Sequence, residues 1–174
     1  MSSKWSYLAG LIDGEGCISI SRQINNYNNR GCADYIQYGF RISITNTSLK
    51  LMKWLISNFG GVYYTKREAT QKHSTSYEWR PKGRNNNEEI LLGILPHLVI
   101  KTEQAKTGLL YVRLGYEKDA QSRETLYQKL RLLNQKGPLP ETNTSDASET
   151  KTEVKIESEL IGDNKSDLAV TQDS

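Results

Sequence analysis

The sequence contains few of the residues from which zinc sites and histidine-based active sites are built. Its two cysteines, Cys17 and Cys32, lie far apart, and it has no CxxC motif. A zinc-finger or zinc-ribbon site is therefore excluded, because the ligands of such a site come in closely spaced pairs. His73 and His97 are the only histidines. This excludes nucleases with histidine-rich metal motifs, and a Ser-His-Asp hydrolase would have to use one of these two.

Long apolar stretches are also missing. Hydrophobic residues make up 36% of the chain, and the longest apolar runs, at 90–95 and 109–114, are too short or too interrupted to cross a bilayer. We therefore expect no membrane partner. Two cysteines and the lack of a targeting signal favour a reducing, intracellular setting, in the cytoplasm and nucleoid or in an organelle matrix.

Charge is divided unevenly along the chain. Residues 137–174 hold nine acidic and three basic side chains, whereas residues 1–136 hold twenty basic and eleven acidic ones. A basic body favours a polyanionic partner such as nucleic acid, although a basic surface that only aids solubility is the alternative. The acidic segment 137–174 has no aromatic residue and little periodicity, so we expect a disordered tail. This tail either competes with DNA for the basic body or is inert.

Hydrophobic periodicity predicts an α+β domain over residues 1–136. Segments 17–25 and 36–45 alternate between apolar and polar side chains, as half-buried strands do. The apolar side chains expected to face the core are Ile18, Ile20, Ile24, Ile36, Tyr38, Phe40, Ile42 and Ile44. Aromatic-rich strands are predicted at 61–67 and 74–81, and helices at 5–13, 51–59, 85–95, 102–114 and 122–136.

This order of elements predicts a four-stranded antiparallel sheet with helices on one face. We expect a saddle whose other face carries polar and basic side chains. Such a face suits a DNA groove, because these side chains reach phosphates and read base edges. An ordinary solvated sheet face is the alternative.

A nine-residue motif, LAGLIDGEG at residues 8–16, is the most specific feature of the sequence. Gly10 and Gly14 are four residues apart on one face of the predicted helix, and the missing Cβ atoms allow a second backbone to approach closely. The chain holds one copy of the motif. An isologous homodimer therefore fits it.

The motif resembles the signature of the LAGLIDADG homing endonucleases, with Gly14 and Glu15 in place of the last Ala-Asp pair. The resemblance continues through Ile44-Thr45-Asn46, through Leu95-Pro96 and through segment 100–105, and it covers roughly residues 5–135. It implies an αββαββα fold and membership of the compact, single-motif group. Members of that group are homodimers whose motif helices cross at the two-fold axis, which implies an interface formed by Leu8, Gly10, Leu11 and Gly14.

The resemblance also implies roles for individual residues. Glu15, just past the end of the motif helix, corresponds to the acid that binds Mg²⁺, and the carbonyl of Gly14 adds a ligand. Lys101 matches a basic residue near the scissile phosphate, and Asn46 a polar residue in the catalytic water network. Asp13 corresponds to a position used for helix packing and capping. Electrostatic repulsion supports a metal ion bound at Glu15, because two copies of this carboxylate near a two-fold axis repel each other unless cations lie between them.

The implied function is that of an intron-encoded, site-specific double-strand DNA endonuclease. It would hydrolyse phosphodiesters with Mg²⁺ at a long pseudo-palindromic site and leave short 3′ overhangs. The outward side chains expected to contact DNA are Ser19, Ser21, Gln23, Asn25, Gln37, Arg41, Ser43, Tyr64, Lys66, Ser76, Glu78 and Arg80. Of these, Arg41 and Arg80 fit guanine, and Glu78 would accept from cytosine or pair with Arg80. The alternative is an intron RNA maturase or a DNA-binding repressor that uses the same fold without cleavage.

Overall fold

The computed structural model describes residues 3–25, 35–114 and 120–135. Its elements are α1 (Ser3–Glu15), β1 (Gly16–Asn25), β2 (Tyr35–Asn46), α2 (Leu49–Phe59), β3 (Val62–Arg67), β4 (Ser76–Arg80), α3 (Arg84–Ile94), the 3₁₀ helix η1 (Leu95–His97), α4 (Thr102–Arg113) and α5 (Ala120–Leu133). The predicted α+β class is confirmed. The predicted disordered tail and Cys32 lie outside the described residues. None of the helices within the described ranges combines the length and hydrophobicity that spanning a membrane requires.

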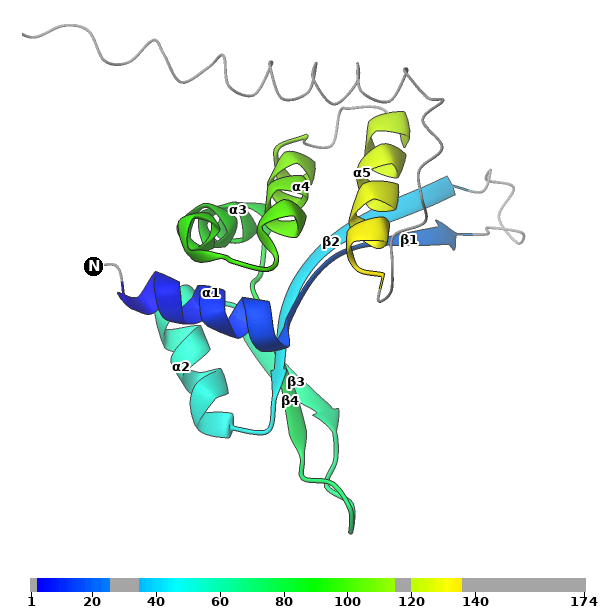
Figure 1. The fold of residues 1–174 in the computed structure, drawn as a ribbon. Coiled ribbons are helices and arrows are strands. Elements are labelled where there is room, and N and C mark those ends of the chain that lie inside the picture. The colour runs from blue at the N-terminus through cyan, green and yellow to red at the C-terminus, as the bar shows by residue number, and fades with distance from the viewer. Residues whose placement is uncertain (1–2, 26–34, 115–119, 136–174) are drawn as a thin grey trace, which may run out of the picture. The chain divides into compact units, whose positions relative to one another are not determined.

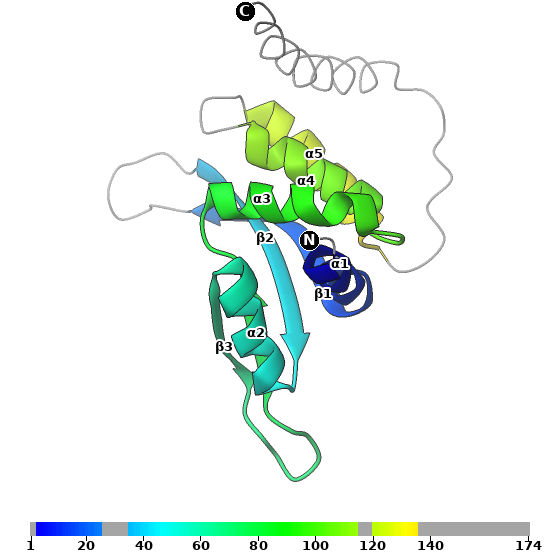
Figure 2. The ribbon, with the colours of Figure 1, turned by 90° about the vertical axis from the view of Figure 1, so that its left-hand side faces the viewer.

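The strands form one antiparallel sheet in the order β1-β2-β4-β3. Strand β2 is the long central strand. It pairs with β1 from the Gly16–Ile44 pair to the Asn25–Tyr35 pair, and its last three residues pair with β4. The sheet curves strongly along β1 and β2, and the helices lie on one side of it (Figures 1 and 2). The predicted arrangement of helices on a single face is confirmed.

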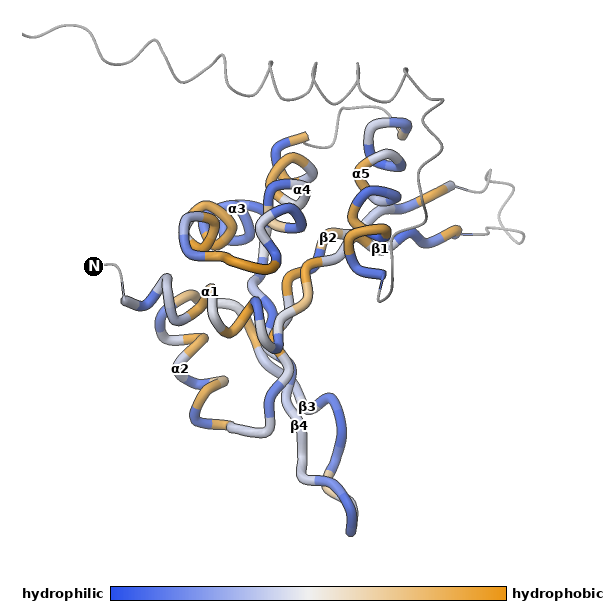
Figure 3. Tube along the Cα trace, viewed as in Figure 1, coloured by the Kyte–Doolittle hydropathy of each residue, from blue (hydrophilic) through white to orange (hydrophobic). Residues whose placement is uncertain are grey.

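The core lies between the helices and the inner face of the sheet, where hydrophobic segments of both meet (Figure 3). Trp79 of β4 is fully buried there, and its indole N–H donates to the carbonyl of Gly60 at 2.9 Å. Ile18, Ile20, Ile42 and Ile44 are buried as predicted.

The prediction is wrong for Ile24 and Ile36, which are 58% and 43% exposed. These two residues pair with each other near the outer ends of β1 and β2. The strands extend beyond the helices at that point (Figure 1), so no helix covers the side chains there.

Local signals set the limits of α2, which begins two residues before the predicted start at 51. The Ser48 side chain caps the helix by accepting from the N–H of Leu51, which satisfies one of the unpaired donors of the first turn. The helix ends at Gly60, whose φ of 67° lies in the left-handed region that glycine adopts without strain. These two caps fix the path of the chain from β2 into β3.

We predict that Gly93→Ala destabilises the protein. A Cβ atom at this position of α3 would lie 2.4 Å from Cε3 of Trp5, whose ring packs against Phe59 with centroids 5.0 Å apart. Alanine favours the helix by roughly 1 kcal/mol over glycine, but overpacking costs about 1–3 kcal/mol. Denaturant unfolding should show a net loss of stability. Asn85→Ala, at an exposed position of the same helix, is the control and should change stability by less than roughly 0.5 kcal/mol. Equal stabilities of the two variants would contradict this packing.

Candidate active site

The carboxylate of Glu15 lies at the junction of α1 and the sheet. The structure corrects one detail, because Glu15 is the last residue of α1 rather than a residue past its end. Its side chain is exposed, and Oε2 accepts a hydrogen bond from the Asn46 amide at 2.5 Å. Asn46 is itself held in place, because its Oδ1 accepts from the backbone N–H of Ser48 at 2.8 Å. The geometry thus brings together Glu15 and Asn46, two of the predicted catalytic residues. The short side chain of Asn46 still reaches the Glu15 carboxylate directly.

An open hollow adjoins this pair and has a volume of about 670 Å³. The residues that line it are Glu15, Thr45, Asn46, Thr47, Lys66, Arg67 and Ser76. One carboxylate and two cationic side chains around a polar hollow suit a phosphate group together with a metal ion. Thr45 and Arg67 were not among the predicted site residues. The signal for Thr45 was its outward position directly before Asn46.

Asp13 fixes the loop between η1 and α4 against the end of α1. Its carboxylate accepts from the backbone N–H groups of Val99 at 2.8 Å, Ile100 at 3.3 Å and Lys101 at 2.9 Å. Partial burial raises the pKa of Asp13, but these hydrogen bonds and the charge of Lys101 outweigh that effect, so the pKa lies below its usual value. Asp13 therefore caps and positions, as the resemblance implied.

Lys101 completes the same clamp from the other side. Its Nζ donates to the carbonyls of Ile12 at 2.6 Å, Asp13 at 2.8 Å and Gly16 at 2.9 Å. The last carbonyls of a helix have no partner within the helix, and a cation there also interacts favourably with the helix dipole. The carbonyl of Gly14 is not among the three acceptors.

These contacts give Lys101 a structural role within the protomer, and its predicted role near the scissile phosphate stays a prediction. An ammonium group has three protons, and here three carbonyls take them, so none is directed at a phosphate. Lys101 lies close to the site, but it acts as a positioning residue for the turn that carries Glu15. No sequence pattern predicts these contacts, because their acceptors are backbone carbonyls, which every residue has.

The glycines of the motif divide into two kinds. No atom of the described residues lies within 4 Å of a Cβ atom built on Gly10 or on Gly14, and both are exposed. At Gly16, in contrast, such an atom would lie 2.6 Å from Cα of Ile12. Gly16 is thus required within the protomer, whereas the face over Gly10 and Gly14 is open. Leu11 is half-buried beside this face, but Leu8 is fully buried in the core, so its predicted place in a dimer interface is wrong.

The outer face of the sheet carries most of the side chains predicted to contact DNA. Ser21, Gln23, Gln37, Arg41, Tyr64 and Lys66 are exposed, and Ser19, Asn25 and Arg80 are half-buried. The sequence left the register of the second hairpin open by one residue, and the structure pairs Tyr64 with Glu78, so both lie on this face while Trp79 points into the core.

Three of the predicted contacts are covered. Ser43 is 7% exposed, Ser76 8% and Glu78 4%. Glu78 is enclosed by the cations and the tyrosine that it binds.

Glu78 accepts from Tyr64 at 2.9 Å and from Nε of Arg80 at 2.5 Å, and it pairs with Lys66 at 2.9 Å. Burial raises its pKa, but the hydrogen bonds from Lys66, Arg80 and Tyr64 outweigh burial and lower the pKa to about 2. The carboxylate is therefore charged and fully used within the protomer. Of the two possibilities for Glu78, pairing with Arg80 is the one observed.

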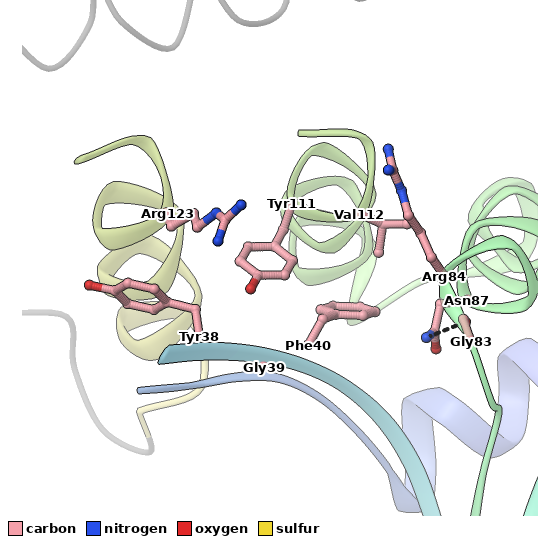
Figure 4. A pocket seen from close by; sticks show the side chains of 9 residues that line it. All are labelled: Tyr38, Gly39, Phe40, Gly83, Arg84, Asn87, Tyr111, Val112 and Arg123. Carbon is pink, nitrogen blue, oxygen red and sulfur yellow. Dashed lines mark hydrogen bonds between the residues drawn. The ribbon is translucent and has the colours of Figure 1, made fainter. Parts of the chain in front are cut away.

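A second pocket, of about 290 Å³, lies on the helix side of the sheet (Figure 4). Its lining residues are Tyr38, Gly39, Phe40, Gly83, Arg84, Asn87, Tyr111, Val112 and Arg123. None of these carries a carboxylate, so the pocket does not offer the ligands that a hard divalent cation prefers. Among the residues that the structure describes, no group of three or more His, Cys, Asp or Glu side chains could hold a metal ion. A metal at Glu15 would need ligands from outside the protomer.

We predict that Lys101→Met lowers stability, because it leaves three carbonyls at the end of α1 without their donor. The expected loss is about 1–3 kcal/mol in denaturant unfolding. Lys106→Met is the matched control. Lys106 forms an exposed ion pair with Glu103, at 2.7 Å, and a change there should be worth less than roughly 0.5 kcal/mol. Unchanged stability of Lys101→Met would refute the clamp.

Comparison with known proteins agrees with this geometry. The family model described as LAGLIDADG endonuclease matches residues 8–111. The comparison with curated proteins found no match. Among solved structures, the fold is similar to the homing endonuclease I-CvuI in complex with the I-CreI target (21% identity, TM-score 0.58, 90% of this chain and 94% of that one).

It is also similar to the archaeal intron-encoded homing endonuclease I-Vdi141I in complex with DNA (17% identity, TM-score 0.61, 91% and 98% of the two chains). At these identities the structural likeness speaks for the fold alone. The family match spans more than half of the sequence and includes the motif, Glu15 and Asn46. On that evidence, the chain belongs to the LAGLIDADG endonuclease family.

Proposed function

We propose that the protein is an intron-encoded homing endonuclease that acts as a homodimer and cuts both strands of DNA with the help of Mg²⁺. Its target would be a long pseudo-palindrome, and its products would carry short 3′ overhangs. The observation that carries this proposal is the exposed carboxylate of Glu15 at the end of α1, beside the open glycine face of the same helix.

The donor set around Glu15 fits a hard divalent cation. The Glu15 carboxylate and the Gly14 carbonyl are oxygen ligands at an exposed helix end. A bound Mg²⁺ would activate water, orient the phosphate and neutralise charge on the leaving oxygen. Asn46 orients the Glu15 carboxylate, and the Asp13–Lys101 clamp holds the turn that presents it. DNA complexes of I-CvuI obtained with magnesium and with calcium support the use of a divalent cation in the family.

A second copy of the chain supplies what one protomer lacks. The described residues hold no group of three or more acidic, histidine or cysteine side chains that could hold a metal ion, and Asp13 is already bound to backbone N–H groups, so a complete metal site would draw on DNA phosphates and the same glutamate of a partner. The open positions over Gly10 and Gly14 let two copies of α1 approach closely. An isologous pair then gives two symmetric sites, one for each strand.

The outer face of the sheet suits the DNA duplex. Polar and basic side chains on β1 to β4 offer both phosphate contacts and donors for base edges. The hairpin of β3 and β4 ends in a hydrophilic tip (Figure 3) that extends the same surface.

Cleavage of an exon junction tests the proposal. The DNA that flanks the reading frame is joined as it would be after intron removal, and this duplex is incubated with the full chain. With Mg²⁺ we expect a double-strand cut at the junction, and with a chelator no cut. Glu15→Gln should reduce the rate by roughly 100-fold or more, because metal-assisted charge stabilisation is worth several kcal/mol. Glu103→Gln removes an exposed acid on α4 and should cut normally.

Other outcomes would contradict the proposal in distinct ways. Cleavage that survives Glu15→Gln would place the chemistry elsewhere. Tight, specific binding without any cut would favour a DNA-binding repressor. Binding of the intron transcript that is unaffected by Glu15→Gln, again without a DNA cut, would favour an RNA maturase.

The dimer is tested by filling the space over the glycine face. Gly10→Leu should leave the protomer folded, since nothing lies near the added Cβ atom, but it should keep two copies of α1 apart. We expect sedimentation velocity to show a dimer for the unmodified protein and a monomer for this variant at the same concentration. Gln121→Leu, at an exposed position of α5, is the control and should remain dimeric. A dimer that is unaffected by Gly10→Leu would place the interface on another surface.

A further inference from the structure

The outer face of the sheet holds a buried carboxylate, which is unusual for a surface that must attract phosphates. Among the buried polar side chains of the described residues, Glu78 is the only one with a charge. It reduces the positive potential that draws DNA to this face. A residue that works against the affinity of the surface needs another explanation.

Glu78 cannot read a base itself. Oε1 accepts from both Tyr64 and Arg80, and Oε2 pairs with Lys66. The side chain is only 5% exposed. Cytosine would have to displace one of these donors and desolvate the carboxylate further. The contacts of Glu78 therefore concern its neighbours, above all Arg80.

Arg80 is held from two directions at once. Its Nε donates to Glu78 at 2.5 Å, and its guanidinium lies 4.7 Å from the centre of the Tyr64 ring. The hydrogen bond uses the Nε edge, and the ring covers one face. The two terminal amino groups make no hydrogen bond with any residue in the described part of the chain, and the side chain is 31% exposed. What remains open is the end of the guanidinium.

This open end has the geometry that guanine requires. Two terminal N–H groups donate side by side to O6 and N7 in the major groove. A free arginine loses much rotamer freedom when it makes such a contact, whereas an arginine already fixed loses less. A fixed arginine also reaches one position only, so it discriminates better than a mobile one.

We propose that Glu78 is a positioning residue for target specificity, which together with Tyr64 fixes Arg80 as a guanine-reading side chain. The inference rests on the proposed function, because it assumes that this face binds DNA. It assigns one guanine to each half-site and one arginine to that guanine. Glu78 contributes to sequence selection without touching the DNA.

The experiment measures base preference at every position of the target. The full chain is incubated with a library of randomised duplexes in the presence of a chelator, and the bound duplexes are sequenced. The same selection is made with Glu78→Gln, Arg80→Lys, the double variant, and Glu68→Gln as a control acid that lies in the β3–β4 turn and is exposed. Thermal unfolding checks that each variant is folded.

We expect Glu78→Gln and Arg80→Lys to lose guanine preference at the same pair of symmetric positions, by roughly 10-fold. The double variant should lose no more than either single one, since both act on one contact. Affinity for unrelated DNA should stay equal or rise for Glu78→Gln, because a negative charge is removed. Tyr64→Phe keeps the ring and removes one hydrogen bond to Glu78. It should weaken the same preference less, and it provides a test if Glu78→Gln fails to fold.

Several results would overturn the inference. In one, the guanine preference is unchanged in Glu78→Gln and Tyr64→Phe. In another, all positions lose preference together with affinity, as a purely structural ion pair would predict. In a third, Glu78→Gln loses a cytosine at a position that Arg80 does not affect. Failure of the proposed function looks different: the unmodified protein would select a target with the expected guanine dependence but would not cut it when Mg²⁺ is added.

Discussion

The candidate active site depends on a reciprocal clamp between Asp13 and Lys101, two residues far apart in the sequence. The carboxylate of Asp13 binds the backbone of the loop that carries Lys101, and the ammonium of Lys101 binds the backbone of the turn that carries Asp13. Each charged group thus forms hydrogen bonds with backbone groups of the segment that carries the other residue, and these backbone groups have no partner within a helix. In the chain, Glu15 lies between Ile12 and Gly16, whose carbonyls accept from Lys101. The backbone position of Glu15 therefore follows from contacts in which Glu15 takes no part.

The two sides of the motif helix differ in what surrounds them. On the inner side, Leu8 and Ile12 are fully buried, and Gly16 makes room for the backbone of Ile12 where the chain turns into β1. On the outer side, Gly10 and Gly14 leave open space. Any side chain at position 16 would clash with Ile12 within the protomer, whereas a side chain at position 10 would clash only with the proposed partner. One short motif therefore encodes both a packed inner side and an open outer side, on which we propose that a second copy of the helix packs.

The outer face of the sheet carries cations that attract phosphates and a carboxylate that holds two of its cations in place. Arg41 and Lys66 are exposed cations, while Glu78 holds Lys66 and Arg80 close to the sheet. The pKa of about 2 shows how strongly these donors favour the charged form of Glu78 over the cost of burying it. Lys66 also reaches Thr45 at 3.1 Å, and both residues line the hollow beside Glu15. The surface that would bind DNA and the candidate catalytic residues thus share a network.

The sequence by itself determined the order of the elements, the two faces of each strand, and the acid at the end of the motif helix. These are local properties: the alternation of Ile18 and Ile20 with serines, or the Ser48 and Gly60 caps of α2, act within a few residues. Only the tertiary structure decided what covers each side chain. In the folded chain Leu8, Ser43 and Glu78 are buried, Ile24 and Ile36 are exposed, and the ammonium of Lys101 donates to three carbonyls. Periodicity assigns a side chain to a face, but the elements that cover that face and the backbone acceptors within reach come from distant parts of the chain.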